Sequence, residues 1–305
     1  LMCTLFGWRA VFVVPLVGGI VVAAAGVKLV QNVGERSNAT LDILSVVLLA
    51  AGITAFVYSV GEFSTNLIAG IVTLFAAVVL LGLFAARQLK LEHPVLNVRP
   101  MASVRFWPAC LLVVVSMMTT FSMSVLLPLY FEGAYGMTAL VAGLLILPAI
   151  ACNAVTSIVG GRVMDARGAW PLLPVGFALI AVGQTAISMT AASMNIGVVV
   201  ALTVVVYAGV GLVLSPSQTA GLETLPVAEH PHGTALLNTW NMIAASFGPS
   251  LFIGLLSSSA ATAGAAGAAT DVAQAIGFAA AVRVAAVIAV VGFATSLVYA
   301  RRESH

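Results

Sequence analysis

Polar side chains recur at helical spacing inside several long apolar stretches of this sequence. In one stretch Ser116, Thr120 and Ser124 follow one another at intervals of four residues, beside Met117 and Phe121. Residues three or four positions apart lie on one face of a helix, so this stretch presents a polar stripe if it is helical. For a single stripe, a seam between packed helices is the simpler interpretation and the wall of an internal cavity is the alternative.

Four later stretches carry similar stripes: Asn153, Ser157 and Gly160; Gln184 and Ser188; Tyr207, Gly211 and Ser215; and Asn238, Asn241, Ala245 and Gly248. Five successive stripes favour an enclosed polar cavity over five separate seams. The side chains that we expect to line it are Met117, Thr120, Phe121, Ser124, Asn153, Gln184, Tyr207, Asn238 and Asn241. Met and aromatic side chains in such a cavity suit amphipathic organic substrates, because Met repacks around varied shapes.

Other kinds of site find little support in the sequence. An enzyme site would need clustered His, Asp or Cys, and a channel would need a charged or carbonyl-rich pore; neither pattern occurs. The cysteines Cys3, Cys110 and Cys152 form no C-x-x-C pair, so we expect neither a disulfide nor a zinc site. His230 and His232 could bind a metal, but a solvated loop is the favoured interpretation. We therefore expect no cofactor and no metal.

The composition defines the elements that must hold these side chains. The chain has 305 residues, of which 61% are apolar and 7% charged, with a mean hydropathy of +1.14. Soluble domains have roughly 45–50% apolar and 25% charged residues, so this chain cannot cover a water-exposed surface, and the lipid bilayer must be its main solvent. The net charge of +2 is spread over short connections and indicates no nucleic-acid partner.

A membrane-spanning helix needs about 20 mostly apolar residues, and nine stretches meet this requirement. They are about 10–30, 41–60, 66–86, 106–131, 138–161, 171–192, 195–217, 234–257 and 278–300. The sequence thus predicts an all-α, polytopic membrane protein. The two longest polar breaks are 87–105 and 218–233, and the small residues from Ser257 to Thr270 are typical of a flexible external loop. The third stretch has one polar side chain, Thr73, and should face lipid.

Positively charged residues of short loops favour the cytoplasmic side of a membrane. With nine spans and a cytoplasmic C-terminus, ten of the twelve Lys and Arg residues fall on that side: Lys28, Arg36, Arg87, Lys90, Arg99, Arg105, Arg162, Arg167, Arg301 and Arg302. Arg9 falls outside. Arg283 falls near the outer end of the last span, where we expect it to reach to the interface, a functional role within the membrane being the alternative. We therefore expect a multi-pass protein of the inner (plasma) membrane with its C-terminus in the cytoplasm.

One connection carries a more specific motif, the segment Gly160-Gly161-Arg162-Val163-Met164-Asp165-Ala166-Arg167-Gly168. Gly161 would allow close approach at a helix end and Gly168 a turn, while Asp165 could cap a helix N-terminus or pair with an arginine. A capped turn with cytoplasmic arginines accounts for these residues in general terms. Their pattern, G-x-x-x-D-x-x-G, also resembles the signature loop of the major facilitator superfamily, which follows the second helix of each six-helix half.

The resemblance covers nearly the whole chain. Its other fragments are Gly7-Trp8-Arg9-Ala10-Val11-Phe12, Leu41-Asp42, His93-Pro94-Val95-Leu96, Leu127-Pro128-Leu129-Tyr130, 142–148, Gly209-Val210-Gly211, Ser215-Pro216-Ser217 and 233–238. In order and spacing they are similar to the fourteen-span drug:proton antiporter family. The resemblance divides the chain into the last helix of the N-terminal half (1–36), two linking helices (37–86), a cytoplasmic linker (87–105) and a C-terminal six-helix half (106–305). Ala166 and Ala169 replace basic residues that are common in the signature loop, and Asn241-Met242 replaces a common Arg-Gln pair.

The resemblance implies alternating access, in which two six-helix halves rock about a central site and export hydrophobic or cationic drug-like substrates as protons enter. The loop that couples this movement would consist of Gly161, Arg162, Asp165, Arg167 and Gly168. The family's first five helices have no counterpart here, and no Asp, Glu or His lies in mid-membrane, so we expect a fragment that is inactive alone, with protons as a partner of the full-length protein. A non-transporting membrane subunit or regulator derived from a transporter half is the alternative.

The start of the chain allows a rival interpretation. The first apolar stretch contains Ala23-Ala24-Ala25, which could be a signal-peptide cleavage site. The stretch is longer than the usual apolar region of a signal peptide, about 7–15 residues, so a membrane span is favoured.

Overall fold

The computed structural model describes residues 10–29, 42–62, 66–91, 94–170 and 172–303, and within them it contains helices and connections but no strand. The α-helices are α2 (Ala10–Leu29), α3 (Ile43–Glu62), α4 (Leu67–Lys90), α5 (Phe106–Tyr135), α6 (Ala139–Arg167), α7 (Leu172–Thr190), α8 (Ile196–Glu223), α9 (His230–Ala265) and α10 (Thr270–Glu303). Three 3₁₀ turns join them: η1 (Arg99–Ala102), η2 (Ala191–Ser193) and η3 (Val227–Glu229).

Eight of these helices, α3 to α10, are long and apolar enough to cross a membrane. At a rise of about 1.5 Å per residue, 20 residues cover the roughly 30 Å of a bilayer core. α2 has 20 residues, and its central part Pro15–Val27 is an apolar helix. The predicted all-α, multi-span fold is therefore confirmed.

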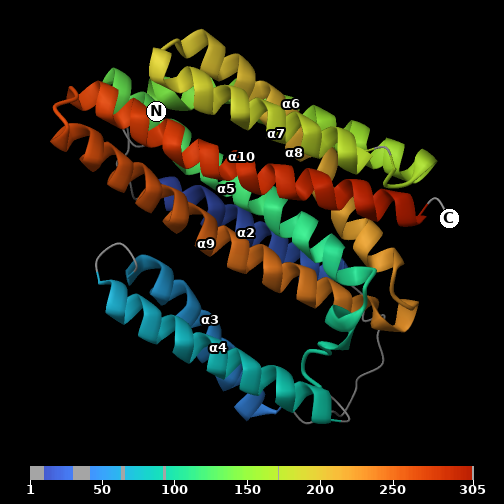
Figure 1. Ribbon diagram of the computed structural model, residues 1–305. Coiled ribbons are helices and arrows are strands. Elements are labelled where there is room, and N and C mark those ends of the chain that lie inside the picture. Colours follow the sequence, from blue (N-terminus) through green and yellow to red (C-terminus); the bar gives the residue numbers. More distant parts are fainter. Residues whose placement is uncertain (1–9, 30–41, 63–65, 92–93, 171, 304–305) are drawn as a thin grey trace. The chain divides into compact units, whose positions relative to one another are not determined.

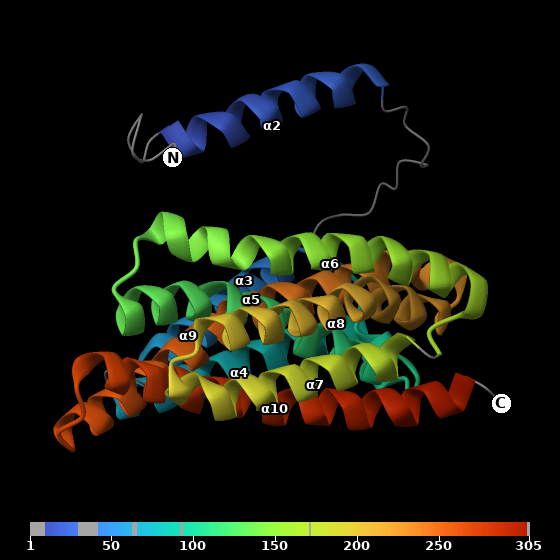
Figure 2. The ribbon, with the colours of Figure 1, turned by 90° about the horizontal axis from the view of Figure 1, so that it is seen from above.

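The chain divides into two compact units. The first, Leu1–Leu41, contains α2, and the second, Asp42–His305, contains the other eight helices. In the second unit consecutive helices run in opposite directions, and α3 and α4 form a hairpin (Figure 1). Seen from above, α6 lies along α8, and α7 lies beside α10 (Figure 2). The odd-numbered helices from α3 to α9 therefore begin at one end of this unit, and the even-numbered ones finish there.

Charged residues distinguish the two ends of the second unit. Eight of its nine described Lys and Arg positions belong to the end where α4, α6, α8 and α10 finish: Arg87, Lys90, Arg99, Arg105, Arg162, Arg167, Arg301 and Arg302. We call this the basic end. The opposite end has the acidic residues Glu62, Glu132 and Asp271. The ninth position, Arg283, is exposed and follows the first residue of α10 by thirteen positions, about 20 Å along the helix.

α8 packs against α5, α6 and α7, and it approaches α6 and α7 closely because glycines face them. A Cβ atom at Gly211 would lie 2.7 Å from the Asn153 carbonyl oxygen and would also overlap Thr156. One at Gly209 would lie 2.5 Å from the Gly176 carbonyl oxygen. Small residues let helix backbones approach within a membrane, where packing replaces the hydrophobic effect as the force between helices.

Tyr130 fastens three elements together at the opposite end. Its ring stacks on that of Phe278 with centroids 4.2 Å apart, and its hydroxyl donates a hydrogen bond of 2.8 Å to the Ala191 carbonyl. α5, α10 and η2 are thus held together by one buried side chain.

Two sequence-based expectations about connections were wrong. The segment Ser257 to Thr270 is helical as far as Ala265, and Thr270 already begins α10, so four residues connect these helices. Likewise 218–233 is largely helix, because α8 continues to Glu223 and α9 begins at His230. Ala and Ser in a long helix tolerate both lipid and water, so composition alone could not place these helix ends.

α4 buries little of its surface, as the single polar residue between Leu67 and Ala86 indicated. Eight large apolar side chains are exposed on it: Ile68, Ile71, Val72, Phe75, Val78, Val79, Leu83 and Leu89. That residue, Thr73, donates a hydrogen bond of 2.7 Å to the Ala69 carbonyl of the same helix, so its hydroxyl proton is paired where the helix faces lipid.

Candidate functional site

Four of the expected cavity residues lie along one face of α5. Met117, Thr120, Phe121 and Ser124 are partly or fully exposed, whereas Ser116 is completely buried. The hydroxyls of Thr120 and Ser124 each donate a hydrogen bond of 2.8 Å to the carbonyl four residues earlier. Their protons are therefore used within α5, and their oxygen lone pairs remain as acceptors.

Tyr207 connects three helices that carry expected cavity residues. Its hydroxyl lies 3.3 Å from the Ser124 hydroxyl of α5, and its carbonyl accepts a hydrogen bond of 3.1 Å from the Asn153 side chain of α6. Tyr207 itself is 5% exposed. Gly211, one helical turn further along α8, gives α6 the close approach that this bond requires. The structure thus brings Ser124, Asn153 and Tyr207 together.

The remaining expected cavity residues do not join this group through any hydrogen bond that the described residues form. Gln184 on α7 is completely buried, and neither atom of its amide has a hydrogen-bond partner. Asn241 on α9 is also buried, with its side-chain oxygen unpartnered, whereas Asn238 is exposed. The sequence placed Gln184, Asn238 and Asn241 in similar polar stripes, but the first and last are buried and Asn238 is exposed.

The expected coupling loop is the last part of α6. Arg162, Asp165 and Arg167 are exposed side chains in its final turns, and Gly168, which directly follows α6, has a φ of +75°. The expected turn at Gly168 is confirmed, since residues other than glycine rarely adopt this φ. Asp165 lies at the C-terminal end of α6 and forms no ion pair with another residue in the described part of the chain.

The close helix approach that we expected at Gly161 occurs at Gly160 instead. No atom lies within 4 Å of a Cβ added at Gly161, whereas one at Gly160 would lie 3.2 Å from the Gly211 carbonyl oxygen. The helical phase decides between adjacent residues, because a step of one residue turns the side-chain direction by about 100°. Gly160 therefore belongs to the α6–α8 seam.

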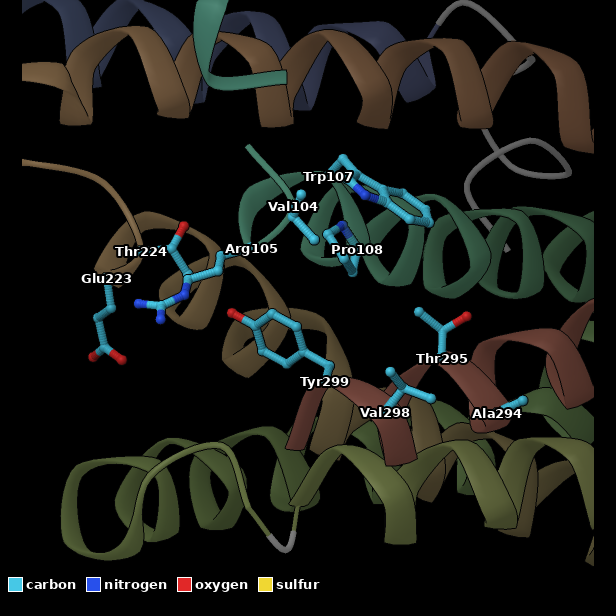
Figure 3. Close-up of a pocket in the computed structure, with 10 residues that line it drawn as sticks. All are labelled: Val104, Arg105, Trp107, Pro108, Glu223, Thr224, Ala294, Thr295, Val298 and Tyr299. Atoms are coloured by element: carbon cyan, nitrogen blue, oxygen red, sulfur yellow. The ribbon is translucent and has the colours of Figure 1, made fainter. Parts of the chain in front are cut away.

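The structure contains a cavity of about 770 Å³ at the basic end, and none of the expected cavity residues lines it. Figure 3 shows the side chains around it, which come from the start of α5, the end of α8 and the last turns of α10. Because its wall is assembled from three helix ends, no helical stripe in the sequence signals it. The only local signal is Arg105 and Trp107 at the start of a span, a pairing typical of the membrane interface.

Charged groups that could exchange protons lie at helix ends. Every acidic side chain described in the second unit is within four residues of an α-helix end: Asp42, Glu62, Glu132, Asp165, Glu223, Glu229 and Asp271. Hydrogen bonds from the Arg87 guanidinium and the Ser45 hydroxyl lower the pKa of Asp42 to about 2. His230 begins α9, and its ring Nε2 lies 3.1 Å from the Leu225 carbonyl oxygen.

Sites for metals or disulfides are not formed by the residues whose side chains are placed. Among them, no three His, Cys, Asp or Glu residues could hold a metal ion together, and both Cys110 and Cys152 are free thiols. Cys3 and His93, which the sequence analysis also considered, lie outside the described residues.

Comparison with known proteins places this architecture in a family. Residues 38–249 match the model of the Major Facilitator Superfamily. The chain is 30% identical to the lincomycin resistance protein LmrB of Listeria monocytogenes over 253 aligned residues. These residues make up 82% of this chain and 54% of the relative. The chain is also 32% identical over 296 residues to the MFS-type transporter YcnB of Bacillus subtilis, covering 95% and 62%. A multidrug resistance protein B homologue of Mycobacterium tuberculosis is 24% identical over 82% of this chain and 48% of its own length.

The chain spans between about half and three-fifths of the length of these curated relatives. The family match includes α3 to α8 and more than half of α9, and so all the helices that carry the expected polar stripes. Eight apolar helices of spanning length agree with this match. The chain therefore belongs to the major facilitator superfamily of membrane transporters, among relatives of the drug-resistance type.

Proposed function

We propose that this chain acts in the export of hydrophobic or cationic drug-like compounds, as part of a proton-coupled antiporter that works by alternating access. The observation that carries the proposal is the 30% identity with lincomycin resistance proteins over 82% of the chain. Transporters of this superfamily are generally non-enzymatic carriers.

The substrate-contacting surface in this proposal is the exposed face of α5, which the buried side chain of Tyr207 supports from behind. Met117 and Phe121 offer apolar and aromatic contacts, and Phe121 could attract a lipophilic cation through its ring face. Ser124 and Thr120 offer acceptor oxygens at the same face. The bonds from Tyr207 to α5 and α6 would hold this surface in one geometry while the unit moves as a whole.

The end of α6 has the role of the coupling loop in this proposal. Arg162, Asp165 and Arg167 are exposed and have no ion-pair partner among the described residues, so they are free to contact helix ends of another half. Such contacts would form in one state of the transporter and break in the other, which is what alternating access requires.

Proton coupling would use groups outside the middle of the described spans. The acidic side chains described in the second unit all lie near helix ends, where we expect them to meet water at the membrane surface. The basic end would face the cytoplasm, because eight of the nine described Lys and Arg positions of this unit belong to it. The C-terminus would then be cytoplasmic, in the inner membrane.

The proposal is tested by binding and export measurements. The chain is purified in lipid nanodiscs and titrated with lincomycin and with tetraphenylphosphonium, a lipophilic cation. We expect saturable binding that Phe121→Ala weakens about tenfold, the loss of one good cation–aromatic contact, and that Phe75→Ala on the lipid-facing side of α4 leaves unchanged. The absence of saturable binding for both compounds would contradict the proposal.

Export is measured in drug-sensitive cells that express the chain, from the accumulation of a fluorescent cation with and without a protonophore. We expect binding in nanodiscs but no export by this chain alone. Protonophore-sensitive export by the chain alone would refute the expectation that it needs further helices and would leave the transport proposal standing. Binding partners recovered without any ligand binding would favour the role of a non-transporting subunit.

A further inference from the structure

The cavity at the basic end lies outside the surface proposed for transport. It has a volume of about 770 Å³ and is lined by Val104, Arg105, Trp107, Pro108, Glu223, Thr224, Ala294, Thr295, Val298 and Tyr299. This volume is in the range of small-molecule sites, about 300–1,000 Å³. Tyr299 donates a hydrogen bond of 3.0 Å to the Ala220 carbonyl, which fastens α10 to α8 and fixes one wall of the cavity.

The cavity is polar at one end and apolar at the other. In Figure 3, Arg105, Glu223 and Thr224 lie at one side, and Trp107, Ala294 and Val298 lie toward the other. Arg105, Glu223 and Thr224 belong to helix ends, whereas Ala294 is deeper, about 7.5 Å before Tyr299 along α10, beside Thr295, whose hydroxyl donates to the Val291 carbonyl of its own helix. The polarity therefore changes along the bundle axis, as it does from the headgroup to the acyl chains of a lipid.

The mouth of the cavity offers one positive and one negative group. Arg105 and Glu223 are both exposed, and neither forms an ion pair with another residue in the described part of the chain. The threonine hydroxyls are already used, since Thr224 donates to the Gly221 carbonyl and Thr295 to the Val291 carbonyl. Arg105 and Glu223 are therefore the two groups at the mouth that could form ionic contacts with a bound molecule.

The flank beside the cavity is apolar. Val104, Trp107 and Val298 are 61%, 45% and 56% exposed, and about two turns back toward the start of α10 Val290 and Val291 are exposed as well. Tryptophan and arginine at the end of a membrane span are typical of the interface between lipid headgroups and acyl chains. An occupant would thus enter from the bilayer.

We propose that this cavity binds one zwitterionic phospholipid bearing a primary ammonium group, with its phosphate on Arg105, its ammonium on Glu223 and an acyl chain along Trp107 and Val298. A purely anionic headgroup would meet the Glu223 carboxylate, and a purely cationic amphiphile would meet the Arg105 guanidinium. Only a headgroup with both charges matches both residues, and only a primary ammonium, unlike the quaternary ammonium of choline, can donate hydrogen bonds to the Glu223 carboxylate. The site is independent of the proposed drug-export function.

The test uses the purified full chain and native mass spectrometry with added phosphatidylethanolamine, phosphatidylcholine or phosphatidylglycerol. We expect one tightly held phosphatidylethanolamine per chain and weaker retention of the other two lipids. Arg105→Gln should weaken phosphatidylethanolamine binding about tenfold, the effect of losing one charge-assisted hydrogen bond. The matched control is Arg99→Gln, at the same end but outside the cavity lining, which should bind like the unaltered chain.

Glu223→Gln separates ligand contact from a structural role. It should reduce the preference for phosphatidylethanolamine over phosphatidylglycerol, because the repulsion of the anionic headgroup is removed, while the melting temperature stays unchanged. Equal retention of phosphatidylethanolamine and phosphatidylglycerol by the unaltered chain would overturn the proposal. So would displacement of the lipid by tetraphenylphosphonium at equal concentration, which would assign the cavity to a cationic substrate instead.

Discussion

Arg87 donates two hydrogen bonds to the carboxylate of Asp42, from Nε to Oδ2 at 2.7 Å and from Nη2 to Oδ1 at 3.0 Å. Arg87 lies near the end of α4, and Asp42 directly precedes α3. The Ser45 hydroxyl also donates to Asp42, and the Gln88 amide donates to Ser45 at 2.6 Å. Gln88 in turn accepts a bond of 3.1 Å from the backbone N–H of Leu96. This chain of bonds fastens the α3–α4 hairpin to the connection that follows it.

The ion pair makes the hairpin sensitive to acid. The pKa of Asp42 falls from 3.8 to about 2, so the pair stabilises the fold above pH 3.8, and this stabilisation is lost as the pH falls toward about 2. We expect limited proteolysis of the connection between α4 and α5, next to this pair, to accelerate over this interval. In Asp42→Asn the acceleration should disappear and cleavage should already be faster at neutral pH. Equal acid sensitivity in both proteins would show that another carboxyl group is responsible.

Gly211 should not tolerate even a methyl group. Gly211→Ala would force α8 away from Asn153 and Thr156 of α6, and we expect a loss of about 1–3 kcal/mol in the free energy of unfolding. Gly143→Ala is the control, because no atom lies within 4 Å of its added Cβ, and it should be neutral or stabilising by about 0.5–1 kcal/mol. Melting temperatures in one detergent provide the comparison, and equal values for the two variants would contradict the close α6–α8 seam.

The unpartnered amide of Gln184 should reduce stability. A buried polar group without a hydrogen bond costs about 1–3 kcal/mol, so Gln184→Met, which keeps the volume, should raise the melting temperature. The control is Ser188→Ala, whose hydroxyl donates to the Thr185 carbonyl at 2.7 Å and should be lost at a small cost. A lower melting temperature for Gln184→Met would show that the amide has a partner such as a bound water.

The topology can be tested at the short connections of the second unit. Single cysteines at Met137 and Ala268, in a background without other cysteines, should react with a membrane-impermeant maleimide added outside intact cells, because both lie at the end opposite the basic residues. A cysteine at Ala102, between α4 and α5, should react only after the membrane is opened. Labelling of Ala102 from outside would reverse the proposed orientation.

A tag at each chain end extends this test. The nine-span layout puts the two ends on opposite sides of the membrane, so a C-terminal tag should be cytoplasmic and an N-terminal tag outside. Finding both tags in the cytoplasm would contradict the nine-span count while leaving the eight helices of the second unit as they are.

The sequence alone was sufficient for the fold class, because 20-residue apolar runs have only one regular structure that satisfies their backbone in lipid. It also located the turn at Gly168, where the positive φ selects glycine. The sequence did not predict the helix ends at Ala265 and Glu223, because small and weakly polar residues give no clear signal for the end of a helix.

Only the tertiary structure decided which polar residues meet. Tyr207 contacts Ser124 and Asn153, whereas Gln184 and Asn241 at similar spacing are buried apart from them. The cavity between Arg105, Glu223 and Thr295 likewise depends on where three helix ends converge. Periodicity states which residues share a face of one helix, but the neighbour of that face is set by packing between helices distant in the chain, which no local pattern records.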